Sequence, residues 1–316
     1  MKLASIDIGS NSIKLVVVEA AAGNSFAVLA SEREVVRLGQ ETLVNRHIGE
    51  VAKRRAIDCL KRFRAVAETH GAETIAAIAT ASVREANNAQ EFIRAVEHET
   101  GLRVEVLSGI EEARLVGLAA SQGCTDKGLT SLNIDIGGGS TEISIFRDGE
   151  PLKLVSVKLG AVGLTDRFIR SDPPAPDELD QLRSEIRSSL QSIAGALLQQ
   201  GWDYTTATSG TAVTIAAAFN GTTTIALPEL KRLNAKLASL TMAERSTIMH
   251  FAPQRADIIV AGGFVLEETM NALAIASLRV CEWSLREGVI IDRLRSAKRS
   301  TDSVASVAGE KIHRVR

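Results

Sequence analysis

The 316-residue sequence is poor in aromatic side chains, which make up only 3% of it. Stacking platforms for bases or single strands are therefore not expected to dominate its chemistry. An excess of one charge is also missing, because the formal net charge is −1, whereas a general nucleic-acid binder is markedly basic. We expect no nucleic-acid partner, and any polyanion must be held by a local site.

Cysteine is scarce as well. Cys59, Cys124 and Cys281 are far apart and show no C-x-x-C spacing, so we interpret them as buried thiols in a reducing compartment rather than as a disulfide set or a zinc site. Asp7 comes too early for a signal-peptide core. The one long uncharged stretch, residues 204–228, is dense in threonine and broken by glycine and proline, which argues against a membrane span. These features predict a cytoplasmic protein.

Several common phosphate and hydrolase motifs are missing too. No G-x-x-x-x-G-K-[ST] occurs, and no G-x-G-x-x-G follows a strand, which excludes a P-loop or a dinucleotide fingerprint. No G-x-S-x-G elbow of a serine hydrolase is present. The five histidines are scattered without the spacing of metal ligands.

What the sequence does contain is an internal repeat. Residues 6–12 read Ile-Asp-Ile-Gly-Ser-Asn-Ser, and residues 134–140 read Ile-Asp-Ile-Gly-Gly-Gly-Ser. Each copy lies between two runs of β-type residues, and a turn signal follows, at 21–24 in one half and 147–150 in the other. Each half is thus predicted to begin with a β-ribbon whose first turn is rich in Gly and Ser.

Beyond each ribbon, the hydrophobic pattern alternates between helix and strand. The expected helices span 51–70, 89–100, 111–121, 177–200, 211–219, 229–240, 256–273 and 285–296, and the strands between them span 74–80, 102–107, 205–208 and 278–281. This pattern predicts an α/β fold of two halves with a cleft between them. We expect a first domain at 1–120, joined by a C-terminal helix at 285–298, a second at 121–284, and a flexible tail at 299–316.

The two Gly/Ser-rich turns are candidate phosphate sites, because such turns expose several backbone N–H groups that bind anions. Two similar copies facing one cleft indicate phosphate binding more strongly than a single copy would. The alternative is a pair of equivalent hairpin turns left by duplication. The expected phosphate-binding residues are Gly9, Ser10, Asn11 and Ser12 in the first copy and Gly137, Gly138, Gly139, Ser140 and Thr141 in the second.

Asp7 and Asp135 stand where each strand enters its turn. A carboxylate beside a phosphate is favourable when a divalent cation lies between them, and Mg²⁺ is bound by one or two carboxylates together with phosphate oxygens. The alternative is an Asp that accepts hydrogen bonds from its own turn. Glu142 could orient a metal-bound water, or it could be an ordinary polar strand residue. The sequence thus predicts Mg²⁺ or another divalent cation at Asp7, Asp135 and Glu142.

The two loops with their ribbons resemble those of the actin, Hsp70 and sugar-kinase superfamily. Further segments narrow the resemblance to the exopolyphosphatase and guanosine pentaphosphate phosphohydrolase family. They are Ala-Thr-Ala-Ser-Val-Arg-Glu-Ala at 79–86, Ser-Gly-Ile-Glu-Glu-Ala-Arg-Leu at 108–115, Asp-Ile-Gly-Gly-Gly-Ser-Thr-Glu at 135–142, Ser-Gly-Thr at 209–211, Arg-Ala-Asp-Ile-Ile-Val-Ala-Gly at 255–262 and Leu-Arg-Glu-Gly at 285–288. The resemblance covers residues 3–295 and implies two actin-like (ribonuclease H-like) domains.

The resemblance also implies roles for single residues. Glu112 matches the catalytic glutamate that activates the attacking water, while Glu111 would point about 100° away on the same helix. Arg84 matches an arginine that reaches the bound phosphate. Gly210 and Thr211 match a third glycine turn, which contacts distal phosphates or a nucleotide. Without the resemblance, the two glutamates would be read as acids favoured in a first helical turn.

These features predict an exopolyphosphatase that removes terminal phosphate from inorganic polyphosphate with a divalent cation. The close alternative is hydrolysis of the 5′-phosphate of guanosine pentaphosphate. An ATP-dependent kinase and a non-catalytic phosphate or nucleotide sensor are the remaining hypotheses. The family resemblance further implies a homodimer. Longer members of the family that the sequence resembles carry an additional C-terminal helical domain, and we expect this protein to be of the short, two-domain form.

Overall fold

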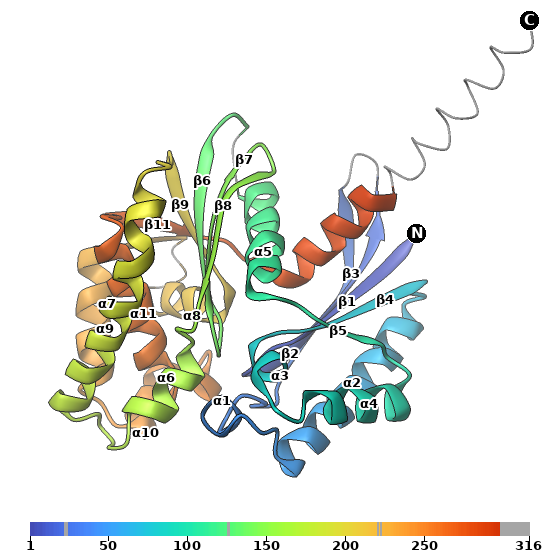
Figure 1. Ribbon diagram of the computed structural model, residues 1–316, viewed down its shortest axis with the longest axis horizontal. Coiled ribbons are helices and arrows are strands. Elements are labelled where there is room, and N and C mark those ends of the chain that lie inside the picture. The colour runs from blue at the N-terminus through green and yellow to red at the C-terminus, as the bar shows by residue number, and fades with distance from the viewer. Residues whose placement is uncertain (22–24, 125–126, 220, 222, 298–316) are drawn as a thin grey trace, which may run out of the picture.

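The computed structural model describes residues 1–21, 25–124, 127–219, 221 and 223–297, which form two lobes, each built on one mixed sheet (Figure 1). The sheet of the first lobe has the order β3-β2-β1-β4-β5. Its strands are β1 (Lys2–Ile8), β2 (Ser12–Ala20), β3 (Phe26–Val35), β4 (Thr74–Ala79) and β5 (Val104–Val106). The first three strands pair antiparallel, and β4 and β5 add in parallel beside β1.

The sheet of the second lobe repeats this order as β8-β7-β6-β9-β11, with β10 added at the edge. Its strands are β6 (Thr130–Ile136), β7 (Thr141–Arg147), β8 (Glu150–Val157), β9 (Tyr204–Thr208), β10 (Thr224–Ala226) and β11 (Ser277–Val280). The ribbon β6-β7-β8 is antiparallel, and β9 pairs in parallel with β6. The sequence repeat is therefore also a repeat of topology, and the predicted two-part α/β fold is confirmed.

The longer helices lie where the sequence predicted them, within a few residues at each end. They are α2 (Glu50–Thr69), α4 (Ala89–Thr100), α5 (Gly109–Gly123), α7 (Pro176–Leu198), α8 (Ser209–Ala218), α9 (Leu227–Ala238) and α11 (Ile259–Ala272), with a further helix over 285–297. Short segments escaped prediction because fewer than three turns carry too little periodicity. They are α1 (Thr42–Asn45), α3 (Ala81–Glu85), α6 (Ala161–Phe168), α10 (Met242–Ile248) and the 3₁₀ turn Pro253–Arg255.

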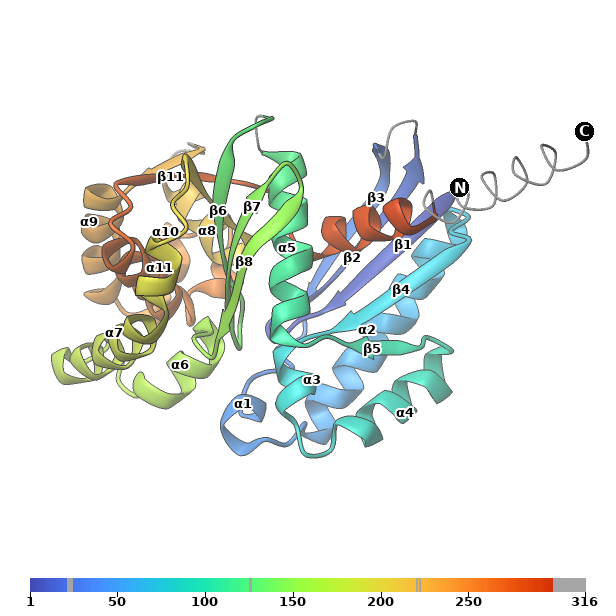
Figure 2. The ribbon, with the colours of Figure 1, turned by 45° about the horizontal axis from the view of Figure 1, so that its top comes forward.

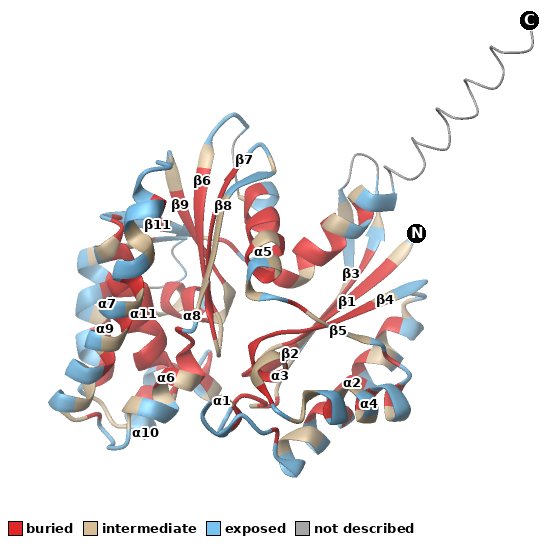
Figure 3. Ribbon diagram, viewed as in Figure 1, coloured by how far each residue is buried: buried red, intermediate tan, exposed pale blue. Residues whose placement is uncertain are grey.

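The central strands of each sheet are buried between helices and are red in Figure 3, whereas the edge strands β3 and β8 contain no buried residue. In the first lobe, Ile6 and Leu15 pack with Leu60 of α2 and Phe92 of α4. A larger core in the second lobe joins residues of β6 and β7 to α7, α8 and α11. The apolar faces of these helices thus hold the strands, and the turns at the strand ends are left free to form a site.

Two helices cross between the lobes and lie beside each other in both views (Figures 1 and 2). On one face, α5 contacts the second sheet, where Gly117 lies against Phe146. The helix at 285–297 packs Ile290 and Leu294 on strands of the first sheet. Leu115 and Val289 meet in a small core between the two helices. Each lobe is therefore covered by a helix that follows the last strand of the other lobe, and we propose the domain limits near 120 and 284 on this basis.

The interpretation of all three cysteines as thiols is wrong. Cys124 and Cys281 form a disulfide across 157 residues, with their Cα atoms 6.2 Å apart, and only Cys59 is a free buried thiol. Cys124 caps the end of α5 and Cys281 follows β11, so the bond ties together the two segments that cross between the lobes. Spacing along the chain could not reveal this pair, because the fold alone brings these distant segments together.

No helix among the described residues is long and apolar enough to cross a membrane. The predicted turn at 21–24 extends beyond the described residues, and the predicted tail at 299–316 lies outside them altogether.

Candidate active site

The two Gly/Ser-rich turns have the same local geometry and meet between the lobes. The Gly9 amide donates to the Ser12 carbonyl over 3.2 Å, and the Gly137 amide donates to the Ser140 carbonyl over 2.9 Å. Gly138 approaches the first turn so closely that a Cβ there would lie 2.7 Å from the Ser10 Cβ. A side chain at Gly138 would therefore push the two loops apart.

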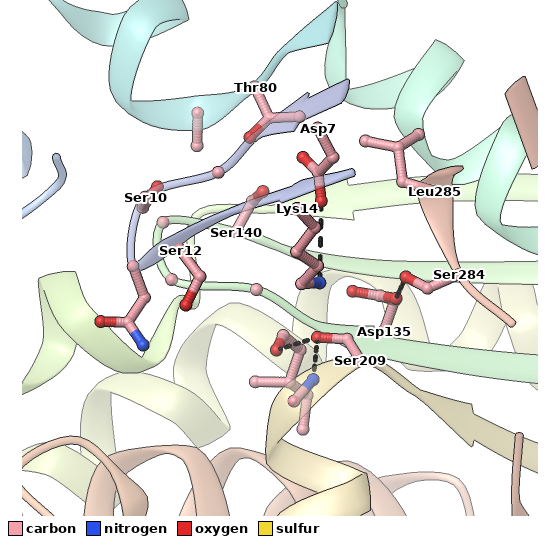
Figure 4. A pocket seen from close by; sticks show the side chains of 18 of the residues that line it. Asp7, Ser10, Ser12, Lys14, Thr80, Asp135, Ser140, Ser209, Ser284 and Leu285 are labelled. Atoms are coloured by element: carbon pink, nitrogen blue, oxygen red, sulfur yellow. Dashed lines mark hydrogen bonds and ion pairs between the residues drawn. The ribbon is translucent and has the colours of Figure 1, made fainter. Parts of the chain in front are cut away.

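A cleft between the turns, here called the main cleft, brings most of the predicted residues together (Figure 4). The predicted residues that line it are Asp7, Gly9, Ser10, Asn11, Ser12, Glu112, Asp135, Gly137, Gly138, Gly139, Ser140 and Gly210. Four other predicted residues, Arg84, Thr141, Glu142 and Thr211, are absent from this lining. The Thr141 hydroxyl instead donates to the Leu159 carbonyl.

Asp7 and Asp135 occupy equivalent positions but have different cross-strand neighbours. Lys14 stands opposite Asp7, and Glu142 stands opposite Asp135. The Lys14 Nζ lies 3.6 Å from Asp7 Oδ2. Burial raises the pKa of the Asp7 carboxyl, and the nearby Lys14 opposes that rise. The first lobe thus places a cation where the second lobe places an acid, which makes the cleft electrostatically asymmetric.

Asp135 is held by two hydroxyl groups. Thr208 Oγ1 donates to Asp135 Oδ2 over 2.6 Å, and Ser284 Oγ donates to the same oxygen over 3.1 Å. Ser284 immediately precedes the helix at 285–297, and its amide is bound by the Glu287 carboxylate at 2.9 Å. The second crossing between the lobes therefore fixes one carboxylate of the main cleft.

Glu112 lies in the first turn of α5 and is only 8% exposed. Its Oε2 accepts from Arg84 Nη1 over 3.0 Å, and the same guanidinium nitrogen donates to the Leu107 carbonyl over 2.8 Å. Burial raises the pKa of Glu112 to about 7, although the Arg84 charge opposes this rise. A carboxyl with this pKa can accept and release a proton near neutral pH.

Glu142 is buried beside this pair. Its Oε1 accepts from the Ser156 hydroxyl over 2.8 Å, while its Oε2 has no hydrogen-bond partner within the described part of the chain. Burial, together with the charges of Glu112 and Asp135, raises the pKa of Glu142 well above its usual range. A proton or a cation is needed to offset this concentration of carboxyl groups.

A divalent cation fits this setting only if phosphate oxygens of the substrate complete its ligand shell. The described residues contain no group of three or more His, Cys, Asp and Glu side chains arranged to hold a metal ion. Mg²⁺ usually takes one or two protein carboxylates and completes its shell with water and phosphate oxygens. Asp7 and Asp135 on the cleft wall, with the unpaired oxygen of Glu142 nearby, suit that kind of shared site, and their role as metal ligands stays a prediction.

Gly210 and Thr211 begin α8 and meet an arginine that sequence reasoning left without a role. A Cβ on Gly210 would lie 2.3 Å from Arg255 Nη1, and Arg255 Nη2 donates to Thr211 Oγ1 over 3.3 Å. Arg255 is 6% exposed and lines the main cleft. Burial lowers the pKa of its guanidinium to about 9. A buried cation without a bonded carboxylate among the described residues suits an anion in the cleft.

Other residues of the main cleft were not predicted from the sequence. Lys14, Ser209 and Ser284 line the main cleft but were assigned no role. Lys14 could have been found by counting alternate positions along the strand after the first turn, because the antiparallel register places it opposite Asp7. Ser284 gave no such signal, since only the return crossing brings it to Asp135.

Comparison with known proteins supports this picture. The model of the Ppx/GppA phosphatase family matches residues 16–297. The chain is 33% identical over 328 residues to "Exopolyphosphatase 1" of Mycobacterium leprae, covering 99% of this chain and 97% of the relative. It is 32% identical to "Exopolyphosphatase 1" of Mycobacterium tuberculosis, covering 99% of this chain and 93% of the relative.

Two solved structures are also similar. An exopolyphosphatase from Cytophaga hutchinsonii superposes with a TM-score of 0.86 at 28% identity, covering 94% of this chain and 98% of that one. The Ppx/GppA family member of Aquifex aeolicus superposes with a TM-score of 0.78 at 26% identity, with the same coverage. These two structures confirm the α/β fold that the sequence predicted.

Proposed function

Because the chain belongs to the Ppx/GppA phosphatase family, we propose that it is an exopolyphosphatase that hydrolyses the terminal phosphate of inorganic polyphosphate. The observation that carries this proposal is the position of Glu112 at a cleft formed by two phosphate-type turns. Its pKa of about 7 leaves a large fraction of the carboxyl ionised at neutral pH. A base in this position favours hydrolysis over simple phosphate binding.

In the proposed reaction, the chain end lies between the turns that begin at Gly9 and Gly137. A water oxygen attacks the terminal phosphorus while Glu112 accepts a proton from that water. The phosphoanhydride bond opposite the water breaks, so the electron pair goes to the oxygen of the shortened chain. The products are orthophosphate and a polyphosphate one unit shorter.

Positioning supplies much of the catalysis in such a reaction. Arg84 holds the Glu112 carboxylate, and its guanidinium suits the charge that spreads over the equatorial phosphate oxygens. The backbone amides of the two turns stabilise the same charge without having to reorient. Lys14 and Arg255 bring further positive charge to the cleft wall.

A divalent cation would supply charge neutralisation and would align the phosphate oxygens. Asp7 and Asp135 are the residues we propose to hold it. Glu142, whose pKa is raised by burial, would ionise more readily when a cation offsets its charge. Its role would then be to orient water beside the chain end.

The deciding experiment compares phosphate release from short polyphosphate, long polyphosphate and guanosine pentaphosphate under identical conditions with Mg²⁺. We expect the highest kcat/KM on polyphosphate. Glu112→Ala should lower kcat by about 10²–10⁴-fold, as is typical for a lost general base. Glu111→Ala is the matched control, because this neighbour pairs with Arg114 instead.

Three outcomes would replace the proposal. Faster turnover of guanosine pentaphosphate would make the nucleotide the substrate. ATP turnover that requires an added acceptor would indicate a kinase. No phosphate release from any anhydride, together with tight binding of one of them, would indicate a sensor.

A further inference from the structure

A second cavity of about 460 Å³, here called the side chamber, adjoins the main cleft. The two share Ala81, Gly139 and Ser140 as lining. A Cβ on Gly139 would lie 2.6 Å from the Ala81 Cβ, so these two residues form the partition between the cavities. The side chamber therefore shares a wall with the main cleft at the second phosphate turn.

The described lining of the side chamber is rich in positive charge. Arg46, Arg84, Lys158 and Arg167 contribute four cations from four segments, whereas Glu85 contributes one carboxylate. That carboxylate is already engaged, because its Oε2 lies 2.5 Å from Lys158 Nζ. Arg46 Nη2 also lies 4.0 Å from Glu85, while Arg84 and Arg167 pair with Glu112 and Glu185, which lie outside this lining. Four cations thus face three carboxylates, which leaves an excess of one positive charge.

Backbone N–H groups add to the positive charge of the side chamber. The helix α5 begins at the side chamber, where Gly109 and Ile110 belong to the lining. Ser108 caps the helix by accepting from the Glu111 amide over 3.1 Å. Amides in the first turn of a 15-residue helix carry a partial positive charge that favours anions. Together with the four cations, they make the side chamber suitable for a compact anion.

The side chamber also lies on a defined side of the reaction centre. In the main cleft, Thr80 and Ser209 lie at opposite ends, with Asp7 and Asp135 between them (Figure 4). Thr80 directly precedes α3, whose Arg84 lines the side chamber and contacts Glu112. The side chamber thus lies beside the Arg84–Glu112 pair, where the proposed attacking water would be held, and its described lining does not include Ser209.

In-line attack moves the phosphorus toward the water and away from the remaining chain. We propose that the side chamber is a binding site for the orthophosphate released by the reaction, through which this product leaves and, at high concentration, inhibits. The direction of release rests on the proposed function. The anion site itself rests on the charges and amides of the side chamber.

The same phosphate chemistry could come from a second source, namely internal units of a long polyphosphate chain. Lys158→Ala/Arg167→Ala removes two cations of the side chamber that do not contact Glu112. Lys231→Ala/Arg232→Ala is the matched control, because both side chains are exposed on α9 and belong to neither cavity lining.

The probe is inorganic phosphate, titrated calorimetrically while a methylene-bridged triphosphate saturates the main cleft, so that no turnover is needed. We expect the chamber variant to raise the phosphate Kd and the product-inhibition constant about tenfold. The control should change neither. An unchanged Kd in the chamber variant would overturn the proposal.

A raised KM for long polyphosphate, without any change in phosphate binding or inhibition, would also overturn the proposal and assign the chamber to the substrate chain. Failure of the proposed function would look different. In that case no phosphate would be released from any anhydride, while the calorimetric titration would still report whether the side chamber binds phosphate.

Discussion

Arg84 Nη1 lies 3.0 Å from Glu112 Oε2, although the two residues are 28 positions apart on different helices. The side chain of Arg84 is 20% exposed, and that of Glu112 is 11% exposed. The pairing favours the ionised carboxylate, while burial favours the protonated carboxyl. Burial has the larger effect, and the resulting pKa of about 7 leaves the carboxyl able to titrate near neutral pH.

The first prediction concerns the pH dependence of hydrolysis. Only ionised Glu112 can accept the proton of water, so kcat/KM should rise with pH through about 7 and then level off. Arg84→Ala should move this acidic limb to higher pH, because a charge that lowers the pKa is lost. Arg103→Ala, whose parent side chain is 92% exposed, serves as the control. An acidic limb that stays in place in Arg84→Ala would contradict this account.

The second prediction concerns stability and has the opposite dependence on pH. A carboxyl whose pKa is raised by folding stabilises the folded state below the unfolded pKa of about 4.5, and this contribution is lost as pH rises through about 7. Glu112→Gln removes the carboxyl whose ionisation causes this loss of stability. Its Tm relative to the parent should therefore increase between pH 5 and pH 8, even though its activity falls.

The control for this measurement is Glu229→Gln on the exposed face of α9. The Tm difference between this control and the parent should not increase between pH 5 and pH 8. A Tm difference for Glu112→Gln that is constant over the same pH range would mean that burial of the charge costs little.

The third prediction concerns the support of the second phosphate turn. A Cβ on Gly160 would lie 2.3 Å from the Gly138 carbonyl oxygen, whereas a Cβ on Gly163 would lie 3.4 Å from the Leu43 side chain. Gly160→Ala must therefore displace the turn, and Gly163→Ala need not. We expect Gly160→Ala to lower kcat/KM by about 100-fold, as misplacement by about 1 Å can do. Gly163→Ala should stay close to the parent, and equal activity of the two variants would contradict the prediction.

The fourth prediction concerns the disulfide. Because Cys124 and Cys281 are separated by 157 residues, the bond restrains a large loop of the unfolded chain and should contribute about 2–5 kcal/mol to the free energy of unfolding. Cys124→Ser/Cys281→Ser should lower the denaturant midpoint, and dithiothreitol should lower the parent midpoint but not that of the variant.

Thiol titration in denaturant provides an independent check. One thiol, that of Cys59, is expected before reduction and three after it. Three thiols before reduction would show that the bond is absent.

The turns at the two strand ends were predictable from the sequence, whereas the residues that pack around them were only partly so. The repeated Asp-Ile-Gly pattern predicted both phosphate-type turns, because hairpin geometry depends on residues next to each other in the chain. The same local logic predicted the long helices, such as α4, whose C-terminal Gly101 adopts a positive φ of 67°. Glu112 and Arg84 were found only through the family resemblance, since their spacing alone is typical of ordinary helix ends.

The sequence by itself therefore determined the duplicated architecture, the two turns and the acids at their entrances. Tertiary structure alone decided that Ser284 reaches Asp135, that Cys124 meets Cys281, and that burial brings the pKa of Glu112 to about 7. The physical reason is the same in each case. Turns and helices depend on neighbours within a few residues, whereas a contact across the lobes and the desolvation of a charge exist only when distant segments have packed.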